Sequence, residues 1–192
     1  MDKIIKQNGI NFGLILGFLL ILPVFLGYAI NVKLIVSYWI LLYVFLSIII
    51  VGIVAIAYSK KYFKGIISFK DAFSTYFVML VISLLISIVM NFLLFNVIDS
   101  DFKQVVKEEQ IKTIESQREW IMVKLANAPQ EQVDETDAKF DEAIQKINEE
   151  DQYSISSLIK GFFISIAIFS LFGLLLALIL KSKKSDEEIT SI

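Results

Sequence analysis

Four apolar runs, each about as long as a bilayer is thick, constrain the fold of this chain more than any other feature of its sequence. A transmembrane helix needs roughly 20 consecutive, mostly apolar residues. Runs of this kind cover residues 12–30, 34–58, 69–97 and 157–180, and none of them holds a charged residue in its central part. We therefore predict an all-α integral membrane protein with four transmembrane helices, three of them within residues 1–97.

Local signals mark where the apolar runs bend and begin. Pro23 lies inside the first run, and we expect a kink there because a neighbouring helix can donate to the carbonyl that a proline leaves free. Asn31–Lys33 separates the first two runs, which predicts a tight helical hairpin. Ser68 stands three residues before Asp71, a spacing that predicts a helix cap at the start of the third span.

The segment at residues 98–156 differs from the rest of the chain because it is strongly charged. From Asp99 to Asp151 it holds 15 acidic and 7 basic residues, a net charge of −8. Its apolar residues recur near every seventh position, interrupted by Arg118, and Asn127–Pro129 marks a turn between two helices. We predict a long coiled-coil hairpin with helices at about residues 102–126 and 130–151. At about 1.5 Å per residue it would project roughly 35 Å from the bilayer.

Lysines gather at matching ends of the spans, which predicts the orientation of the chain. They precede the first span, lie between the second and third, and follow the fourth: Lys3, Lys6, Lys60, Lys61, Lys64, Lys70, Lys181, Lys183 and Lys184. Because basic residues concentrate in short cytoplasmic loops, we expect both termini and the tail at residues 181–192 to be cytoplasmic. Residues 98–156 are then extracytoplasmic. A cleaved signal peptide is the alternative for the first run, and it would lower the helix count without changing this orientation.

The residue types present exclude several chemistries. The chain has no cysteine and no histidine, so disulfides, thiolate or imidazole metal sites and histidine bases are excluded. Asp99 and Asp101 are the carboxylates best placed to bind a cation or to act as acid and base at a membrane surface. We favour the alternative that both cap a helix by accepting its free amide protons. We expect no catalytic residue, no cofactor and no metal site, and we do not expect an enzyme.

Small residues four positions apart indicate close packing between membrane helices. Such pairs are Gly13 with Gly17, Ser83 with Ser87, and Gly173 with Ala177. We expect at least one pair to be a contact within the bundle, and the alternative is a homodimer. Asn91 is expected to hydrogen-bond between helices. Its alternative role is to line, together with the serines, a polar path shared between copies.

A loop rich in lysine and aromatic residues connects the second and third spans. We predict that it is anchored in the headgroup layer, where aromatic rings lie at the interface and ammonium groups reach water. The predicted anchors are Lys60, Lys61, Tyr62 and Lys64. The lipid bilayer is thus the first partner we expect. Basic residues occur only in short runs beside the membrane, so we expect no binding of nucleic acid.

Three segments, taken in order, carry a family resemblance. They are NFGLILG at Asn11–Gly17, GIISFKDAF at Gly65–Phe73 and FNVIDSDF at Phe95–Phe102, followed by a charged helical loop and a final apolar helix. In this order the chain resembles the domain of unknown function 4199 family of small bacterial membrane proteins, over nearly its whole length. One departure is Ser100, where proline is frequent in the family. The resemblance implies the four-helix architecture and a bacterial inner membrane, and it carries over no activity.

The lack of chemical groups in the spans and the external apolar seam favour a non-enzymatic scaffold or accessory protein. Its hairpin would be an interaction module for an envelope protein or for a second copy of the chain. Trp120 lies one position off the seam, so it is a candidate partner contact if it is partly exposed. The alternative is that Trp120 packs within the hairpin or against its base. The alternative function is an oligomeric transporter or channel.

Overall fold

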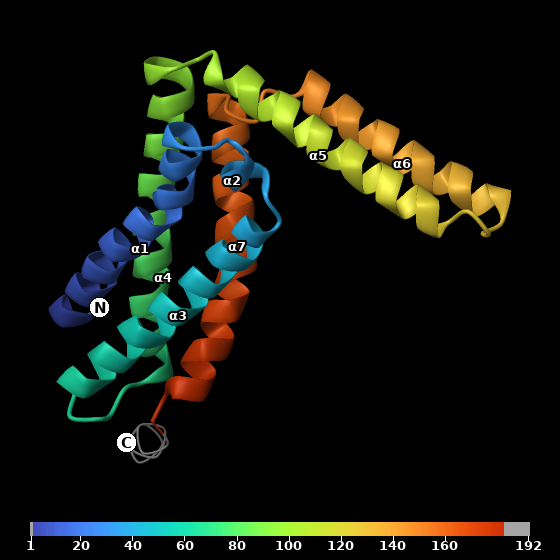
Figure 1. Cartoon of the computed structure of the whole chain (residues 1–192). Helices are drawn as coiled ribbons and strands as arrows, with labels where there is room; N and C mark the ends of the chain where they lie inside the picture. The colour runs from blue at the N-terminus through green and yellow to red at the C-terminus, as the bar shows by residue number, and fades with distance from the viewer. Residues whose placement is uncertain (1, 183–192) are drawn as a thin grey trace.

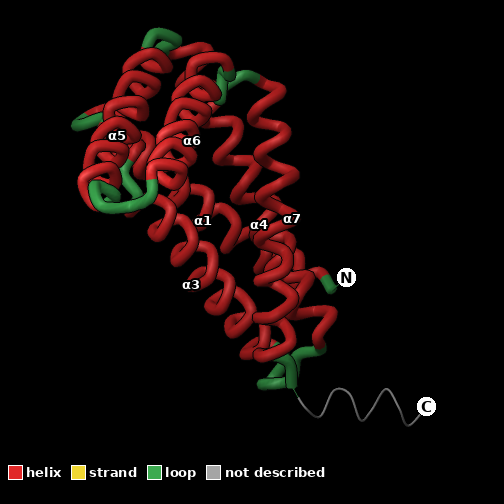
Figure 2. The backbone as a smooth tube through the Cα atoms, turned by 90° about the vertical axis from the view of Figure 1, so that its right-hand side faces the viewer, coloured by secondary structure: helices red, strands yellow, loops and turns green. Residues whose placement is uncertain are grey.

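The computed structural model describes residues 2–182, and these residues form helices and loops without a strand (Figures 1 and 2). The helices are α1 (Lys3–Ala29), α2 (Lys33–Val36), α3 (Trp39–Tyr62), α4 (Phe69–Leu93), the π-helix η1 (Leu94–Ile98), α5 (Phe102–Lys124), α6 (Gln130–Glu149) and α7 (Ile155–Leu180). Four helices are long and apolar enough to cross a membrane, namely α1, α3, α4 continued by η1, and α7. The chain is therefore a multi-pass membrane protein. Most of the expected tail, including Lys183 and Lys184, lies outside the described residues.

Helix α4 lies at the centre of the bundle, in contact with α1, α3 and α7 (Figure 1). Three glycines of α1, spaced four residues apart, face three branched side chains of α4: Gly9 faces Val78, Gly13 faces Ile82 and Gly17 faces Ile86. A Cβ added at Gly13 would lie 2.8 Å from the Cβ of Ile82, so the close approach of the two helices depends on glycine. Gly13 and Gly17 thus pack inside this chain, and Gly9 extends the same contact by one turn.

Tyr76 of α4 joins three helices in the middle of the bundle. Its side chain is fully buried, and its hydroxyl donates to the carbonyl of Phe169 in α7 at 3.0 Å. Gly52 of α3 and Gly173 of α7 lie against opposite edges of the ring. A Cβ added at Gly52 would lie 2.6 Å from Cε2, and one added at Gly173 would collide with Cδ1 and Cε1. These two glycines therefore form the space that the ring occupies, with buried Ala177 one turn beyond Gly173.

Pro23 lies inside α1 without ending it. A proline has no amide hydrogen, so the carbonyl four residues earlier, that of Leu19, loses its helical partner. The hydroxyl of Tyr43 in α3 donates to this carbonyl at 3.0 Å. A neighbouring helix thus replaces the missing hydrogen bond, as expected for a membrane helix that contains proline.

Replacing Tyr43 with phenylalanine should lower the free energy of unfolding by about 1–3 kcal/mol, because the part-buried Leu19 carbonyl then has no donor. Chemical unfolding in detergent micelles measures this change. The matched background is Pro23→Ala, in which the amide of residue 23 can donate to Leu19 again. Tyr43→Phe should cost clearly less in that background, and equal costs in both backgrounds would contradict the repair role of Tyr43.

The helices that contain the first two predicted spans begin at other residues than those spans do. α1 starts at Lys3 rather than at residue 12, because the Asp2 carboxylate accepts from the amide of Ile4 at 2.7 Å and caps a polar first turn. The connection predicted at Asn31–Lys33 is longer than expected. It continues through the short helix α2, and α3 begins only at Trp39. Hydropathy does not reveal this break because the side chains of α2 are mostly apolar. The cap of α4 is confirmed: the Ser68 hydroxyl accepts from the amide of Asp71 at 3.1 Å.

The α5–α6 pair, residues 102–149, leaves the bundle where η1 ends and α7 begins. The two helices lie side by side in both views (Figures 1 and 2). They run sideways from the bundle and back toward the level of the connection between α2 and α3 (Figure 1). The projection of roughly 35 Å from the bilayer stays a prediction. Arg118 joins the two helices, with Nε 2.7 Å from Asp137 and Nη1 2.8 Å from Asp141. This explains why a charged residue interrupts the apolar seam of α5.

Candidate functional site

The junction between the bundle and the α5–α6 pair is our candidate functional site, because it decides where the pair points. Its apolar part centres on Phe95, which is fully buried in η1. The ring of Tyr153, just before α7, stacks on Phe95 with centroids 3.6 Å apart, and the ring of Phe102 stacks on it at 5.6 Å. Tyr28 of α1 meets Phe102 edge to face. Tyr28 and Tyr153, from distant parts of the sequence, thus meet Phe95 and Phe102 in one aromatic cluster.

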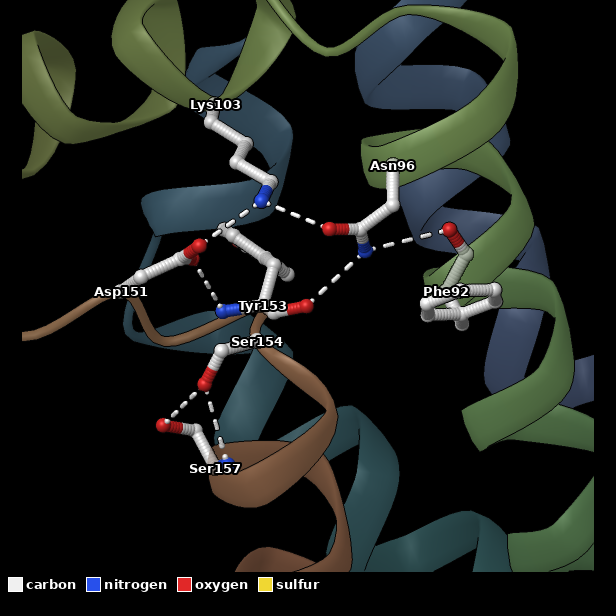
Figure 3. A network of polar contacts seen from close by, with 7 residues as sticks. All are labelled: Phe92, Asn96, Lys103, Asp151, Tyr153, Ser154 and Ser157. Carbon is white, nitrogen blue, oxygen red and sulfur yellow. Dashed lines mark hydrogen bonds and ion pairs between the residues drawn. The ribbon is translucent and has the colours of Figure 1, made fainter.

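A polar network lies beside this cluster (Figure 3). The ammonium group of Lys103 donates to the side-chain oxygen of Asn96 and to the carboxylate of Asp151, each at 2.8 Å. The amide nitrogen of Asn96 donates to the carbonyl of Tyr153 at 2.9 Å and to that of Phe92 at 3.2 Å. Lys103 and Asn96 therefore hold the start of α5, the end of η1 and the entry to α7 together.

The protonation states at the junction follow from these contacts. The hydrogen bond from Lys103 lowers the pKa of Asp151, and the backbone amide of Tyr153 lowers it further by donating at 2.9 Å. Burial raises the pKa of Tyr153 to about 12, with a smaller contribution from the charge of Asp151. At neutral pH the carboxyl of Asp151 is thus ionised and the phenol of Tyr153 is neutral.

Acid should loosen the junction. The folded pKa of Asp151 is depressed, so its contribution to stability is present above the ordinary aspartate value of 3.8 and is lost as pH falls through the folded value. We expect the mobility of a spin label on α6 to rise as pH falls below about 4. The Asp151→Asn variant should show this mobility already at neutral pH and little further change in acid. A transition unchanged in the variant would show that another carboxylate is responsible.

Asp99 and Asp101 lie beside the junction and differ in role. The Asp99 carboxylate accepts from the amide of Phe102 at 3.1 Å and from the hydroxyl of Tyr28 at 3.2 Å. Asp101 occupies the N-cap position of α5, but its side chain makes no cap hydrogen bond. We predicted that both residues cap the helix. Asp99 does so, because it lies within reach of the first amide of α5, and Asp101 does not. Among residues 2–182, no cluster of carboxylates suited to a metal ion is present.

Ser83 and Asn91, two polar residues of α4 that the sequence singled out, bond within their own helix. Ser83 is fully buried and its hydroxyl donates to the carbonyl of Leu80 at 2.9 Å. The side-chain nitrogen of Asn91 donates to the carbonyl of Ser87 at 2.7 Å. The expected hydrogen bond from Asn91 to another helix is thus replaced by one to the preceding turn. Buried polar contacts between helices meet at Ser59 of α3, whose hydroxyl accepts from Asn8 of α1 at 3.1 Å and from Thr75 of α4 at 3.2 Å.

The predicted interfacial anchors lie at the end of the bundle opposite the α5–α6 pair (Figure 1). Lys61, Tyr62 and Lys64 are exposed there. Lys60 has a structural contact, since its ammonium group donates to the carbonyl of Leu180 at 2.9 Å and so caps the end of α7.

Trp120 is exposed on α5. Its side chain is 61% exposed, and the ammonium group of Lys124 lies 3.5 Å from the centre of its ring. The alternative that Trp120 packs inside the pair is therefore wrong. The ring points out of the seam because Arg118, two positions earlier, takes the place between the two helices.

A family model described as "Protein of unknown function (DUF4199)" matches residues 11–182. The chain belongs to the DUF4199 family. The match extends from α1 to the end of α7 and confirms the resemblance that we inferred from the sequence. The searches of curated proteins and of solved structures found no match to this DUF4199 protein.

One side of the junction could be predicted from the sequence and the other could not. Asp99 was a predicted cap, whereas Lys103 and Asp151 were not among the predicted site residues. Their meeting depends on contacts across 48 residues of chain, and such contacts have no local signature. The available signal was Asn96, an amide near the end of an apolar span, where a buried polar group needs partners.

Proposed function

We propose that this DUF4199 protein is a non-enzymatic scaffold or accessory protein of the bacterial inner membrane. In this proposal the α5–α6 pair lies outside the cytoplasm and binds an envelope protein or a second copy of the chain, and both termini are cytoplasmic. Lysines at the end of the bundle opposite the pair support this orientation, because positive residues concentrate in cytoplasmic loops.

The observation that carries the proposal is the firm attachment of a charged, exposed helix to a membrane bundle. α6 holds 7 acidic and 2 basic residues, whereas α5 holds 4 acidic and 5 basic residues. The junction holds both helices in one direction through Lys103 and the Phe95 cluster. A surface that is already oriented loses less entropy on binding. The acidic surface of α6 suits a partner with a basic surface.

Photocrosslinking in intact cells tests this function. Ala138 and Gln145 are exposed on α6, and each would carry the crosslinking group. We expect the same protein adduct from both positions, and we expect the Glu135→Lys, Glu142→Lys double variant to lose it. Phe163, 64% exposed on α7, is the control position. Absence of adducts from α6, or the same adducts from residue 163, would contradict an interaction role for the pair.

The orientation has a separate test. Because the chain has no cysteine, single cysteines placed at Ala138 and Lys61 give unambiguous labelling. A thiol reagent that does not cross membranes should label Ala138→Cys in intact cells and Lys61→Cys only after lysis. Labelling of Lys61→Cys in intact cells, with Ala138→Cys labelled only after lysis, would contradict an extracytoplasmic pair. The crosslinking result would still hold.

A further inference from the structure

One face of α5 carries every exposed large apolar side chain of the α5–α6 pair. These are Val105, Trp120 and Val123, which are 45%, 61% and 76% exposed. At 3.6 residues per turn, their positions fall within one side of the helix. The large apolar residues of α6, by contrast, are all at least partly covered. The uncovered apolar face thus belongs to α5 alone.

This face of α5 looks toward the membrane bundle. It forms one wall of a groove of about 970 Å³. Glu109, Lys112, Ser116 and Trp120 line it from α5, and the opposite wall includes Lys33 and Tyr38, at the connection between α2 and α3. This connection joins the ends of two membrane-length helices, α1 and α3, so it marks the level of the bilayer surface. The pair turns back toward that level (Figure 1).

Aromatic and basic residues on or next to both walls match the chemistry of a headgroup layer, and Glu109 and Glu115 line the α5 wall beside them. Tyr38 and Trp39 are 57% and 76% exposed at the start of α3. Tyrosine and tryptophan favour the depth of the headgroups, and lysines there reach lipid phosphates. Lys112 is exposed on α5, and Lys124 lies over the Trp120 ring. The strongly acidic helix of the pair, α6, packs on α5 and does not line the groove.

We infer that this face of α5 docks on the phospholipid headgroups of the bilayer that the bundle spans. Trp120 and Val123 enter the headgroup layer, and Lys112 and Lys124 bind lipid phosphate. Docking holds α6 on the side away from the lipid, where it is free to meet a protein. The inference deepens the proposed function by naming a second partner of the pair, and it holds whichever compartment contains the pair.

Tryptophan fluorescence in vesicles tests the docking. The full chain with Trp39→Phe keeps Trp120 as its one tryptophan, because the chain has two. It is reconstituted in phosphatidylcholine with phosphatidylglycerol, with or without a lipid spin-labelled near the headgroup. We expect the spin label to lower Trp120 emission by about twofold or more. The Lys112→Glu, Lys124→Glu double variant alters only exposed side chains and should lose most of this quenching.

The matched control moves the tryptophan to the other helix of the pair. In a Trp39→Phe, Trp120→Phe background, Ala138→Trp reports on the exposed side of α6, and aqueous iodide should quench it while the lipid label does not. The inference would be overturned if iodide quenched Trp120 and the lipid label did not, as in this control. It would also be overturned if the protection of Trp120 from iodide depended on the ratio of protein to lipid, since a second copy of the chain would then cover the face. Either result leaves the crosslinking and labelling tests of the proposed function unaffected.

Discussion

Replacing Gly173 with leucine should abolish recovery of folded, monodisperse protein, and alanine at this position should lower the free energy of unfolding by about 3 kcal/mol. The reason is the enclosed ring of Tyr76, which a Cβ at residue 173 would strike directly. The ring cannot move away, because Gly52 lies against its other edge and its hydroxyl is bonded to α7. Size-exclusion profiles and unfolding in detergent measure both effects.

Gly161 provides the control in the same helix. It is exposed, and a Cβ added there would meet no atom within 4 Å. Gly161→Ala should be neutral or slightly stabilising, since alanine favours a helix over glycine by about 1 kcal/mol. Similar losses at residues 161 and 173 would show that the penalty arises from the helix itself rather than from Tyr76. A smaller cost of Gly173→Ala in a Tyr76→Ala background would identify the ring as the obstacle.

Phe95→Ala should release the α5–α6 pair from its fixed direction. Truncation of a buried phenylalanine costs about 3–5 kcal/mol, and here the loss falls on the stacking with Tyr153 and Phe102. Spin labels at Gln145→Cys on α6 and Gly161→Cys on α7 report the angle of the pair as a distance distribution. We expect a narrow distribution in the parent chain and a broad one in the variant.

A second phenylalanine separates this effect from a general loss of stability. Phe163 is exposed on α7, so Phe163→Ala should keep the narrow distribution. Lys103→Met should broaden it to an intermediate extent, because the apolar cluster remains while the bridge between Asn96 and Asp151 is lost. A narrow distribution in Phe95→Ala would mean that the polar network alone directs the pair.

Much of the fold could be predicted because its signals are local. The four spans follow from hydropathy, and the start of α4 follows from the spacing of Ser68 and Asp71. The glycines of α1 indicated close packing, although the partner helix could not be named. These features depend on residues within a few turns of one another, where periodicity and capping carry the information.

The direction of the α5–α6 pair could not be predicted, because it depends on distant residues. Tyr153 stacks on Phe95 from 58 positions away, and Lys103 reaches Asp151 across 48. The break between α2 and α3 was hidden for another reason: after Lys33, the residues of α2 are apolar like those of the span that follows. For Trp120 the position off the seam was visible in the sequence, but its exposure follows from the place of Arg118 between the helices.

The α5–α6 pair is joined to the bundle at two points, where η1 leads into α5 and where α6 leads into α7, so the pair can act as a lever. The length of this lever is roughly 35 Å, since the 23 residues of α5 rise about 1.5 Å each, and its pivot is the Phe95 cluster. Asn96, at the end of the central helix, is bonded to the carbonyl of Tyr153 at the entry to α7. A pull on the tip therefore applies torque to α4 and α7 together. Because α4 contacts the other three spans, we expect a force that tilts the pair to turn the bundle as one body rather than to separate a single helix.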